Sequence, residues 1–99
     1  MQLNLENEKA ILAFGHVQAE RDEEGRLIPL RGPTQPAKAV TTAWIRFDDG
    51  EVWMGNAWCS LQDQFCKERG RKLALARALQ NSPDREWRKI VWEQYFLRV

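Results

Sequence analysis

The pattern of apolar and polar residues divides the chain into a β part followed by an α part. Residues 9–18, KAILAFGHVQ, are largely apolar and contain no proline, which predicts a strand. The polar stretch 19–26 predicts a turn, and residues 26–30 predict a short return strand that Pro29 restricts to a sheet edge. Two prolines and a glycine within residues 32–37 predict a loop.

The strongest local signal is a β-hairpin with its turn at Asp49-Gly50. The β-rich stretches 40–47 and 51–59 flank this pair, which is typical of a two-residue type I′ turn. In that register the numbers of paired residues sum to 99. The core face then comprises Thr41, Ala43, Ile45, Phe47, Val52, Met54, Asn56 and Trp58.

The same register predicts the contacts on the other face of the hairpin. Arg46 meets Trp53 as a cation–π pair, and Trp44 covers the bare backbone of Gly55. A slip of one residue would exchange the two faces of one strand.

Two helices are predicted after the sheet. The first runs from about Ser60 to Gln80, and Ser60 with Asp63 resembles a capping box. Its inner face comprises Leu61, Phe65, Leu75, Ala76 and Leu79. Gly70 lies in the middle of this helix, which indicates close packing or a kink because glycine is costly there.

The second helix begins at Ser82-Pro83-Asp84, an N-cap followed by a proline and an acid in the first turn. It runs to about Leu97. One stripe comprises Trp87, Ile90, Val91 and Tyr95. Trp92 and Phe96 lie on a different face, which is either buried as well or contacts a partner, and a homodimer through these two residues is one option.

These elements predict an α+β fold with a small antiparallel sheet of three or four strands and two C-terminal helices packed on one face. The 99 residues form a single domain, 1–99, with a β part at about 1–59 and a helical part at about 60–99. Hydrophobic residues make up 43% and charged residues 29%, a globular composition.

Several features bear on the location of the protein. No apolar run approaches the length of a transmembrane helix, and the first ten residues show no signal-peptide pattern. The two cysteines are too few for a disulfide framework. We therefore expect a protein of the reducing cytoplasm that makes no contact with membranes.

Charge is distributed unevenly along the chain. The formal net charge is +1, but residues 1–59 carry nine acids and six bases, whereas residues 60–99 carry five acids and nine bases. The uneven distribution predicts a molecule with a polar axis of charge, although the small net charge argues against a strongly basic nucleic-acid binder.

Residues 55–79 combine a strand end and a helix in a specific spacing, Gly-x-x-x-Cys-x-x-x-Asp-x-Phe-Cys-Lys-x-x-Gly-Arg-Lys-x-Ala-Leu-x-Arg-Ala-Leu. This pattern resembles a family of small proteins common in tailed bacteriophages and prophages, in which a short second helix follows. The resemblance implies a phage accessory protein acting in the cytoplasm of the bacterial host. It implies no particular activity.

Two groups of residues are candidate binding sites. Arg46, Trp44 and Trp53 would lie together on the sheet face opposite the helices, where they would stack on bases or anchor a protein unless the N-terminal strand or the long loop covers them. The other group is basic and lies on the first helix, opposed only by Glu68: Lys67, Arg69, Arg71, Lys72 and Arg77. These bases do not share one helix face, and they either contact phosphates or an acidic protein groove or form a solvated helix surface.

Catalytic and metal-binding patterns are weak. Gly70-Arg71-Lys72 lies inside a predicted helix, so it is not a phosphate-binding loop. Cys59, Cys66 and His16 are too few for a closed zinc site, and both cysteines are expected to be small buried hydrophobes. We therefore predict no catalytic residue, no metal and no cofactor.

Three non-enzymatic functions are consistent with this sequence. The first is a phage inhibitor of a host defence factor that binds a host protein or nucleoprotein complex, in the manner of an anti-CRISPR protein. Small size, uneven charge and five tryptophans favour it. The alternatives are a nucleic-acid-binding module that contacts the phosphate backbone and an oligomer that sequesters a nucleotide signal.

Overall fold

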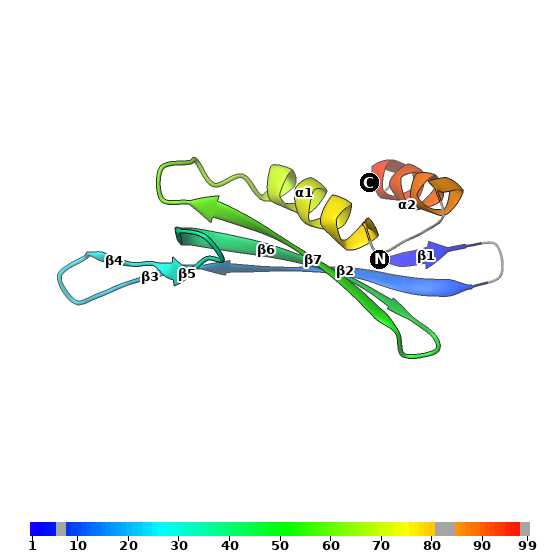
Figure 1. Ribbon diagram of the computed structural model, residues 1–99, viewed down its shortest axis with the longest axis horizontal. Helices are drawn as coiled ribbons and strands as arrows, with labels where there is room; N and C mark the ends of the chain where they lie inside the picture. Colours follow the sequence, from blue (N-terminus) through cyan, green and yellow to red (C-terminus); the bar gives the residue numbers. More distant parts are fainter. Residues whose placement is uncertain (6–7, 81–84, 98–99) are drawn as a thin grey trace.

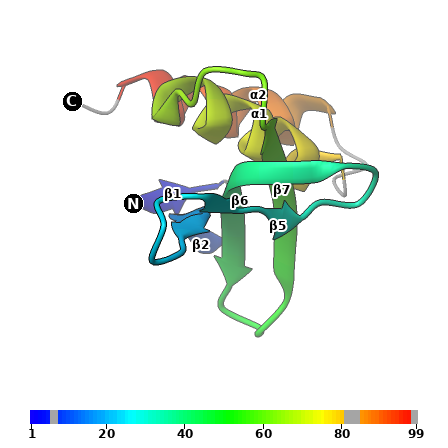
Figure 2. The same ribbon diagram turned by 90° about the vertical axis from the view of Figure 1, so that its left-hand side faces the viewer.

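Two C-terminal helices lie together over one face of an antiparallel sheet in the computed structural model (Figure 1). The structure describes residues 1–5, 8–80 and 85–97. The predicted α+β fold, with both helices on one face of the sheet, is confirmed. Seen along the sheet in Figure 2, the helices form one layer and the strands the other.

The main sheet is organised around two long strands, β2 and β6. It has five strands, where three or four were predicted: β1 (Gln2–Asn4), β2 (Lys9–Gln18), β5 (Leu30–Arg31), β6 (Pro36–Phe47) and β7 (Val52–Ser60). β2 pairs with β1 and β6, whereas β6 pairs with β2, β7 and, at its start, β5. The predicted strand 9–18 is β2.

A narrow arm extends the sheet at one end of the molecule (Figure 1). Its strands β3 (Glu20–Arg21) and β4 (Leu27–Ile28) pair with each other as a separate two-stranded sheet. The predicted return strand at 26–30 is therefore split into β4 and β5, with Pro29 between them. Proline cannot donate to a strand ladder, which explains the interruption.

The β6–β7 hairpin turns through three residues, Asp48 to Gly50, and not through the predicted pair Asp49-Gly50. The Phe47 amide donates to the Glu51 carbonyl (2.9 Å), the Gly50 amide donates to the Phe47 carbonyl (3.0 Å), and Gly50 has φ +94°. This is the geometry of a type I turn completed by a glycine in the left-handed region.

The extra loop residue shifts the register by one, so the predicted sum of 99 is wrong. Ile45 lies opposite Trp53, and Trp44 lies opposite Met54, which gives a sum of 98. The faces of β6 are as predicted, with Thr41, Ala43, Ile45 and Phe47 buried under the helices. The faces of β7 are exchanged, because successive strand residues point to opposite sides.

This exchange places two tryptophans differently from the prediction. Trp58, predicted in the core, lies opposite Val40 on the face away from the helices. Trp53, predicted on that face, packs into the core beside Phe47 and Trp87 with ring centroids 4.8 and 5.1 Å away. The predicted pair between Arg46 and Trp53 is therefore absent, and Arg46 lies opposite Val52.

Helix α1 spans Lys67–Leu79, so it begins seven residues after the predicted start at Ser60. The Ser60 hydroxyl donates to the Asp63 carboxylate (2.8 Å) and the Asp63 amide donates to the Ser60 carbonyl (3.3 Å), but these bonds close a turn and not a helix. Leu61 and Phe65 are consequently not helical. The buried face of α1 comprises Ala74, Leu75, Ala78 and Leu79.

Helix α2 spans Arg85–Leu97. Val91 and Tyr95 are fully buried and Trp87 and Ile90 pack against the core, which confirms the predicted stripe. The predicted helix start at Ser82-Pro83-Asp84 lies outside the described residues.

Two glycines allow α1 to approach the sheet closely. A Cβ at Gly55 of β7 would collide with the α1 backbone at Ala74 and Ala78, and a Cβ at Gly70 would lie 2.6 Å from the Thr41 hydroxyl oxygen. The predicted close packing at Gly70 is therefore confirmed. These contacts fix α1 directly above β6 and β7.

Candidate binding surfaces

The helical layer is strongly basic. Helices α1 and α2 carry eight basic and three acidic residues. The five predicted bases of α1 do not form one patch, because they point in different directions along the helix. Lys67 and Arg69 are exposed in the first turn, and neither makes an ion pair with another residue in the described ranges. Arg77 extends to the edge of the sheet and donates to the Asn56 carbonyl (2.5 Å).

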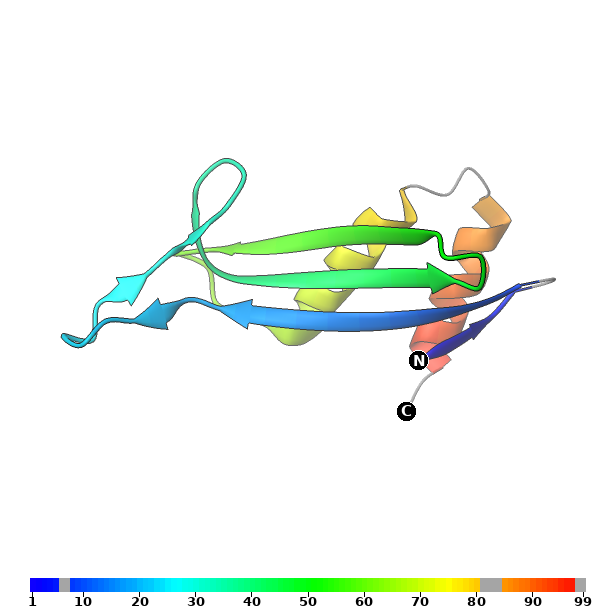
Figure 3. The same cartoon turned by 90° about the horizontal axis from the view of Figure 1, so that it is seen from below.

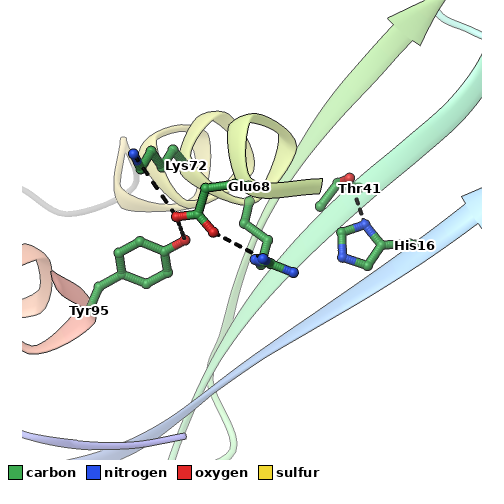
Figure 4. Close-up of polar contacts among 6 residues, drawn as sticks. His16, Thr41, Glu68, Lys72 and Tyr95 are labelled. Atoms are coloured by element: carbon green, nitrogen blue, oxygen red, sulfur yellow. Dashed lines mark hydrogen bonds and ion pairs between the residues drawn. The ribbon is translucent and has the colours of Figure 1, made fainter. Parts of the chain in front are cut away.

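Glu68 partly neutralises two of these bases (Figure 4). Its carboxylate lies 2.9 Å from the Arg71 guanidinium and 4.0 Å from the Lys72 ammonium, and it accepts a hydrogen bond from the Tyr95 hydroxyl (3.3 Å). The hydrogen bond with Glu68 raises the pKa of Arg71. Glu68 thus joins α1 to α2, and Arg71 has a structural role in addition to its charge.

An aromatic pair beside this junction consists of Trp92, which is half-buried against the core, and Phe96, which is exposed. The rings of Trp92 and Phe96 stack with centroids 5.6 Å apart and planes inclined by 22°, and Phe96 is 60% exposed. The Lys72 ammonium lies 5.6 Å from the centre of the Phe96 ring, a cation–π contact. We name Lys67, Arg69, Lys72, Trp92 and Phe96 the helical-layer surface.

The sheet presents a second surface on the side away from the helices (Figure 3). The predicted residues Trp44 and Arg46 lie on this side, and Trp53 does not. Trp44 covers Gly15 of β2, where a Cβ would lie 2.8 Å from the indole ring, and not the predicted Gly55. We name this surface the open sheet face: Ile11, Ala13, Gly15, Val17, Val40, Thr42, Trp44, Arg46, Val52, Met54, Asn56 and Trp58.

Sequence reasoning missed most of the open sheet face. The signal was present in β2, where Ile11 and Val17 on one face and Ala10 and Leu12 on the other are all apolar. A strand that is apolar on both faces is typical of sheets that are covered on both sides. Because the predicted register was wrong by one residue, Met54 was predicted on the core face, whereas it lies on the open sheet face.

A small pocket of about 130 Å³ lies beside the start of α1, and Cys59, Phe65, Cys66 and Arg69 are among its lining residues. Cys59 is half-buried and Cys66 is exposed, so the prediction that both are buried is wrong for Cys66. The Cys59 thiol lies 3.7 Å from the carbonyl oxygens of Ser60 and Asp63. Both contacts are with backbone carbonyl oxygens, which do not act as an activating base for a thiol.

His16 lies on the core side of β2 and shares a hydrogen bond with the Thr41 hydroxyl, with Nδ1 and Oγ1 2.9 Å apart. Partial burial, together with the charges of Arg71 and Lys67, lowers the pKa of His16. The ring therefore favours its neutral form. Among the residues described by the structure, no three His, Cys, Asp or Glu side chains come together as a metal site.

The fold and its two surfaces define a small two-layer α+β protein. A comparison with known proteins gives no match, since no family model fits the sequence and no curated protein or solved structure is significantly similar. The resemblance of residues 55–79 to phage proteins therefore stays a prediction. Neither of the described helices has the length and apolar character needed to cross a bilayer.

Proposed function

We propose that this protein catalyses no reaction and acts by binding an acidic surface of another protein through the helical-layer surface. The observation that carries this proposal is the exposed Phe96 ring, stacked on the half-buried Trp92, beside the excess positive charge of α1 and α2. Aromatic and basic side chains together are enriched at the centres of protein interfaces, and charge complementarity speeds association.

A protein partner is favoured over nucleic acid by the arrangement of these residues. The bases of α1 diverge, and Glu68 engages both Arg71 and Lys72, so they do not form a row that would follow a phosphate backbone. The Phe96 ring already contacts Trp92 and Lys72, which makes it a poor platform for base stacking.

The biological setting that we propose is the one that the phage resemblance implies. A phage accessory protein of this size would act on a host protein in the bacterial cytoplasm, and blocking a defence factor requires only tight binding. The two alternatives, binding of a nucleic acid and sequestration of a nucleotide, would use the same basic side chains. The experiment below distinguishes them from binding of a host protein.

The test is affinity capture from a bacterial host lysate at about 150 mM salt, with and without nuclease. The altered protein carries Arg69→Glu and Lys72→Glu on the helical-layer surface. Its matched control carries Arg21→Glu and Arg26→Glu on the exposed β3–β4 arm, which changes the net charge equally. Circular dichroism verifies that both variants fold.

The proposal predicts a defined host protein that survives nuclease treatment, is captured by the wild type and the arm control, and is lost with the helical-layer variant. The purified host protein should then bind the wild type with fixed stoichiometry. Retention of nucleic acid alone, or equal capture of the same protein by both variants, would contradict the proposal.

A further inference from the structure

The two edges of the main sheet end differently (Figure 3). At the β1 edge, the Gln94 side chain of α2 donates to the Asn4 carbonyl (2.6 Å) and accepts a hydrogen bond from the Asn4 amide (2.9 Å), so it occupies groups that a neighbouring strand would use. The opposite edge is β7, which pairs with β6 alone among the described strands. Its nine residues include no proline and no charged side chain, which are common devices against pairing with another chain.

β7 presents alternate main-chain groups along this edge. The Phe47 amide donates to the Glu51 carbonyl and paired residues sum to 98, so Trp53 and every second residue after it hydrogen-bond to β6. The amides and carbonyls of the intervening residues point away from β6: Val52, Met54, Asn56 and Trp58. A strand that lies alongside β7 has main-chain groups at the same spacing.

Arg77 of α1 lies against the middle of this edge. Its guanidinium donates to the Asn56 carbonyl (2.5 Å), and among the residues described by the structure this is the only hydrogen bond to the outward groups of β7. Leu73 lies one turn earlier on the same side of α1, is 41% exposed, and lines a pocket with Trp58 and Cys59. α1 thus places an apolar and a cationic side chain beside a row of unpaired main-chain groups.

A second cavity, of about 300 Å³, lies where β7 ends. Trp58, Ser60 and Arg77 line it together with residues 33–37, and Arg77 is the one charged lining residue in the part of the chain that the structure describes. Arg77 therefore borders both the middle of the edge and this cavity. It is the cationic group that a segment bound along the edge must pass.

We propose that the β7 edge binds an extended segment of a partner protein as an added strand, with an acidic side chain of that segment next to Arg77. The outward amides and carbonyls are satisfied by the main chain of another strand, which is the chemistry of strand addition. An amide of the added strand takes the place of Arg77 at the Asn56 carbonyl. The freed guanidinium then pairs with the carboxylate in a charge-assisted hydrogen bond.

An acidic segment suits this edge better than a second copy or a nucleic acid does. Two β7 strands paired about Asn56 would bring two Arg77 guanidinium groups together, and β7 supplies no acid to separate them. A nucleic acid lacks the alternating amides and carbonyls that pair with a strand edge. None of the outward groups of β7 belongs to the helical-layer surface, so this proposal does not rest on the proposed function.

The first experiment titrates the full chain with synthetic peptides and follows it by nuclear magnetic resonance. The peptides have nine residues, as β7 has, alternate valine with threonine, and carry a short polyethylene glycol chain for solubility. Their central residue is glutamate, glutamine or lysine. We expect saturable binding, with the glutamate peptide binding about fivefold more tightly than the lysine peptide because of Arg77. Amide hydrogen exchange should slow at Met54 and Asn56 but not at Gly55, whose amide already bonds to β6.

The second experiment removes one outward donor by Met54→Pro. The Met54 amide points away from β6, so proline keeps the existing ladder but blocks an added strand. The variant should bind the glutamate peptide at least ~10-fold more weakly. The matched control Met54→Ala loses the same side chain but keeps the amide, and should bind within about threefold of the wild type. Circular dichroism verifies that both variants fold.

A modified peptide tests the same pairing without altering the protein. Methyl groups on the peptide nitrogens that face β7 remove the hydrogen-bond donors and leave every side chain in place, so binding should be lost. The proposal would be overturned by equal binding of the methylated peptide, or by no saturable binding of any peptide up to about 1 mM. Protection of the β7 amides that rises with protein concentration in the absence of peptide would assign the edge to a second copy instead. Equal binding of the glutamate and lysine peptides would overturn the role of Arg77.

Discussion

His16 is the single histidine of the chain, and its lowered pKa predicts a link between stability and pH. Partial burial, and then the charges of Arg71 and Lys67, lowers its pKa in the folded protein below the usual value of 6.5. The unfolded chain therefore binds the proton more readily than the folded one does. Linkage then requires that the contribution of His16 is complete above pH 6.5 and is lost as the pH falls below that value.

We therefore expect His16→Gln to flatten the pH dependence of stability between pH 7.5 and 5.5, because glutamine keeps a hydrogen-bonding group near Thr41 but cannot titrate. The measurement is the free energy of unfolding in urea at both pH values for the wild type and the variant. Equal losses in the two proteins would show that other groups are responsible.

At the scale of single residues, the candidate binding sites could be predicted from the sequence only in part. Trp44, Arg46 and the five bases of α1 could be identified from residue type, and the structure places Trp44 and Arg46 on the predicted face. The contacts of Glu68 with Arg71 and Lys72 have i,i+3 and i,i+4 spacing and could have been predicted from a helix there, whereas the Tyr95 hydroxyl that also reaches Glu68 comes from α2 and could not.

At the scale of elements, the contact between α1 and β7 depends on the missing side chain of Gly55. Gly55→Ala should destabilise the fold by about 3 kcal/mol, because the new methyl group meets helix backbone that cannot move aside. Gly15→Ala is the matched control in the sheet, where the methyl group meets only the movable end of Trp44 and should cost less. Urea denaturation of both variants checks the order.

The β6–β7 turn provides a second test at this scale. Gly50 has φ +94°, so Gly50→Ala should cost about 1–2 kcal/mol, whereas Gly50→Asn should cost less because asparagine adopts the left-handed region more readily. The measurement is again the free energy of unfolding. Equal stability of the alanine variant and the wild type would contradict the assigned turn geometry.

The same turn explains which part of the fold could be predicted. The alternation within β6 identified its buried face directly, since that pattern needs no partner. The faces of β7 were inferred through the turn, and the segment Asp48-Asp49-Gly50 accommodates a two-residue or a three-residue loop. Because the turn has one residue more than predicted, Trp53 lies on the core face of β7 and Trp58 lies on the opposite face, which is the reverse of the prediction.

The start of α1 was misplaced for a similar reason. Ser60 and Asp63 have the residue types of a helix start, and they do form a hydrogen bond, but the chain continues as a turn until Cys66. Local side-chain pairing cannot by itself distinguish a closed turn from the first turn of a helix. The position of α1 depends instead on two close contacts, that of Gly55 with the α1 backbone and that of Gly70 with Thr41.

At the scale of the whole molecule, binding through the helical-layer surface should depend on salt. Raising NaCl from about 50 to 500 mM shortens the screening length several-fold. Retention of the protein on a poly-glutamate resin should fall steeply, because the helical layer is cationic. Retention that does not change with salt would contradict binding through a charged surface.

The tryptophans divide between the two sides of the sheet, and this division has an optical consequence. Trp53 and Trp87 lie 5.1 Å apart and join the sheet to α2, whereas Trp44 and Trp58 lie on the open sheet face. Near-ultraviolet circular dichroism reports fixed aromatic packing. The first pair should therefore report on the packing of α2 against the sheet, so the native chain carries its own optical reporter for the assembly of its two layers.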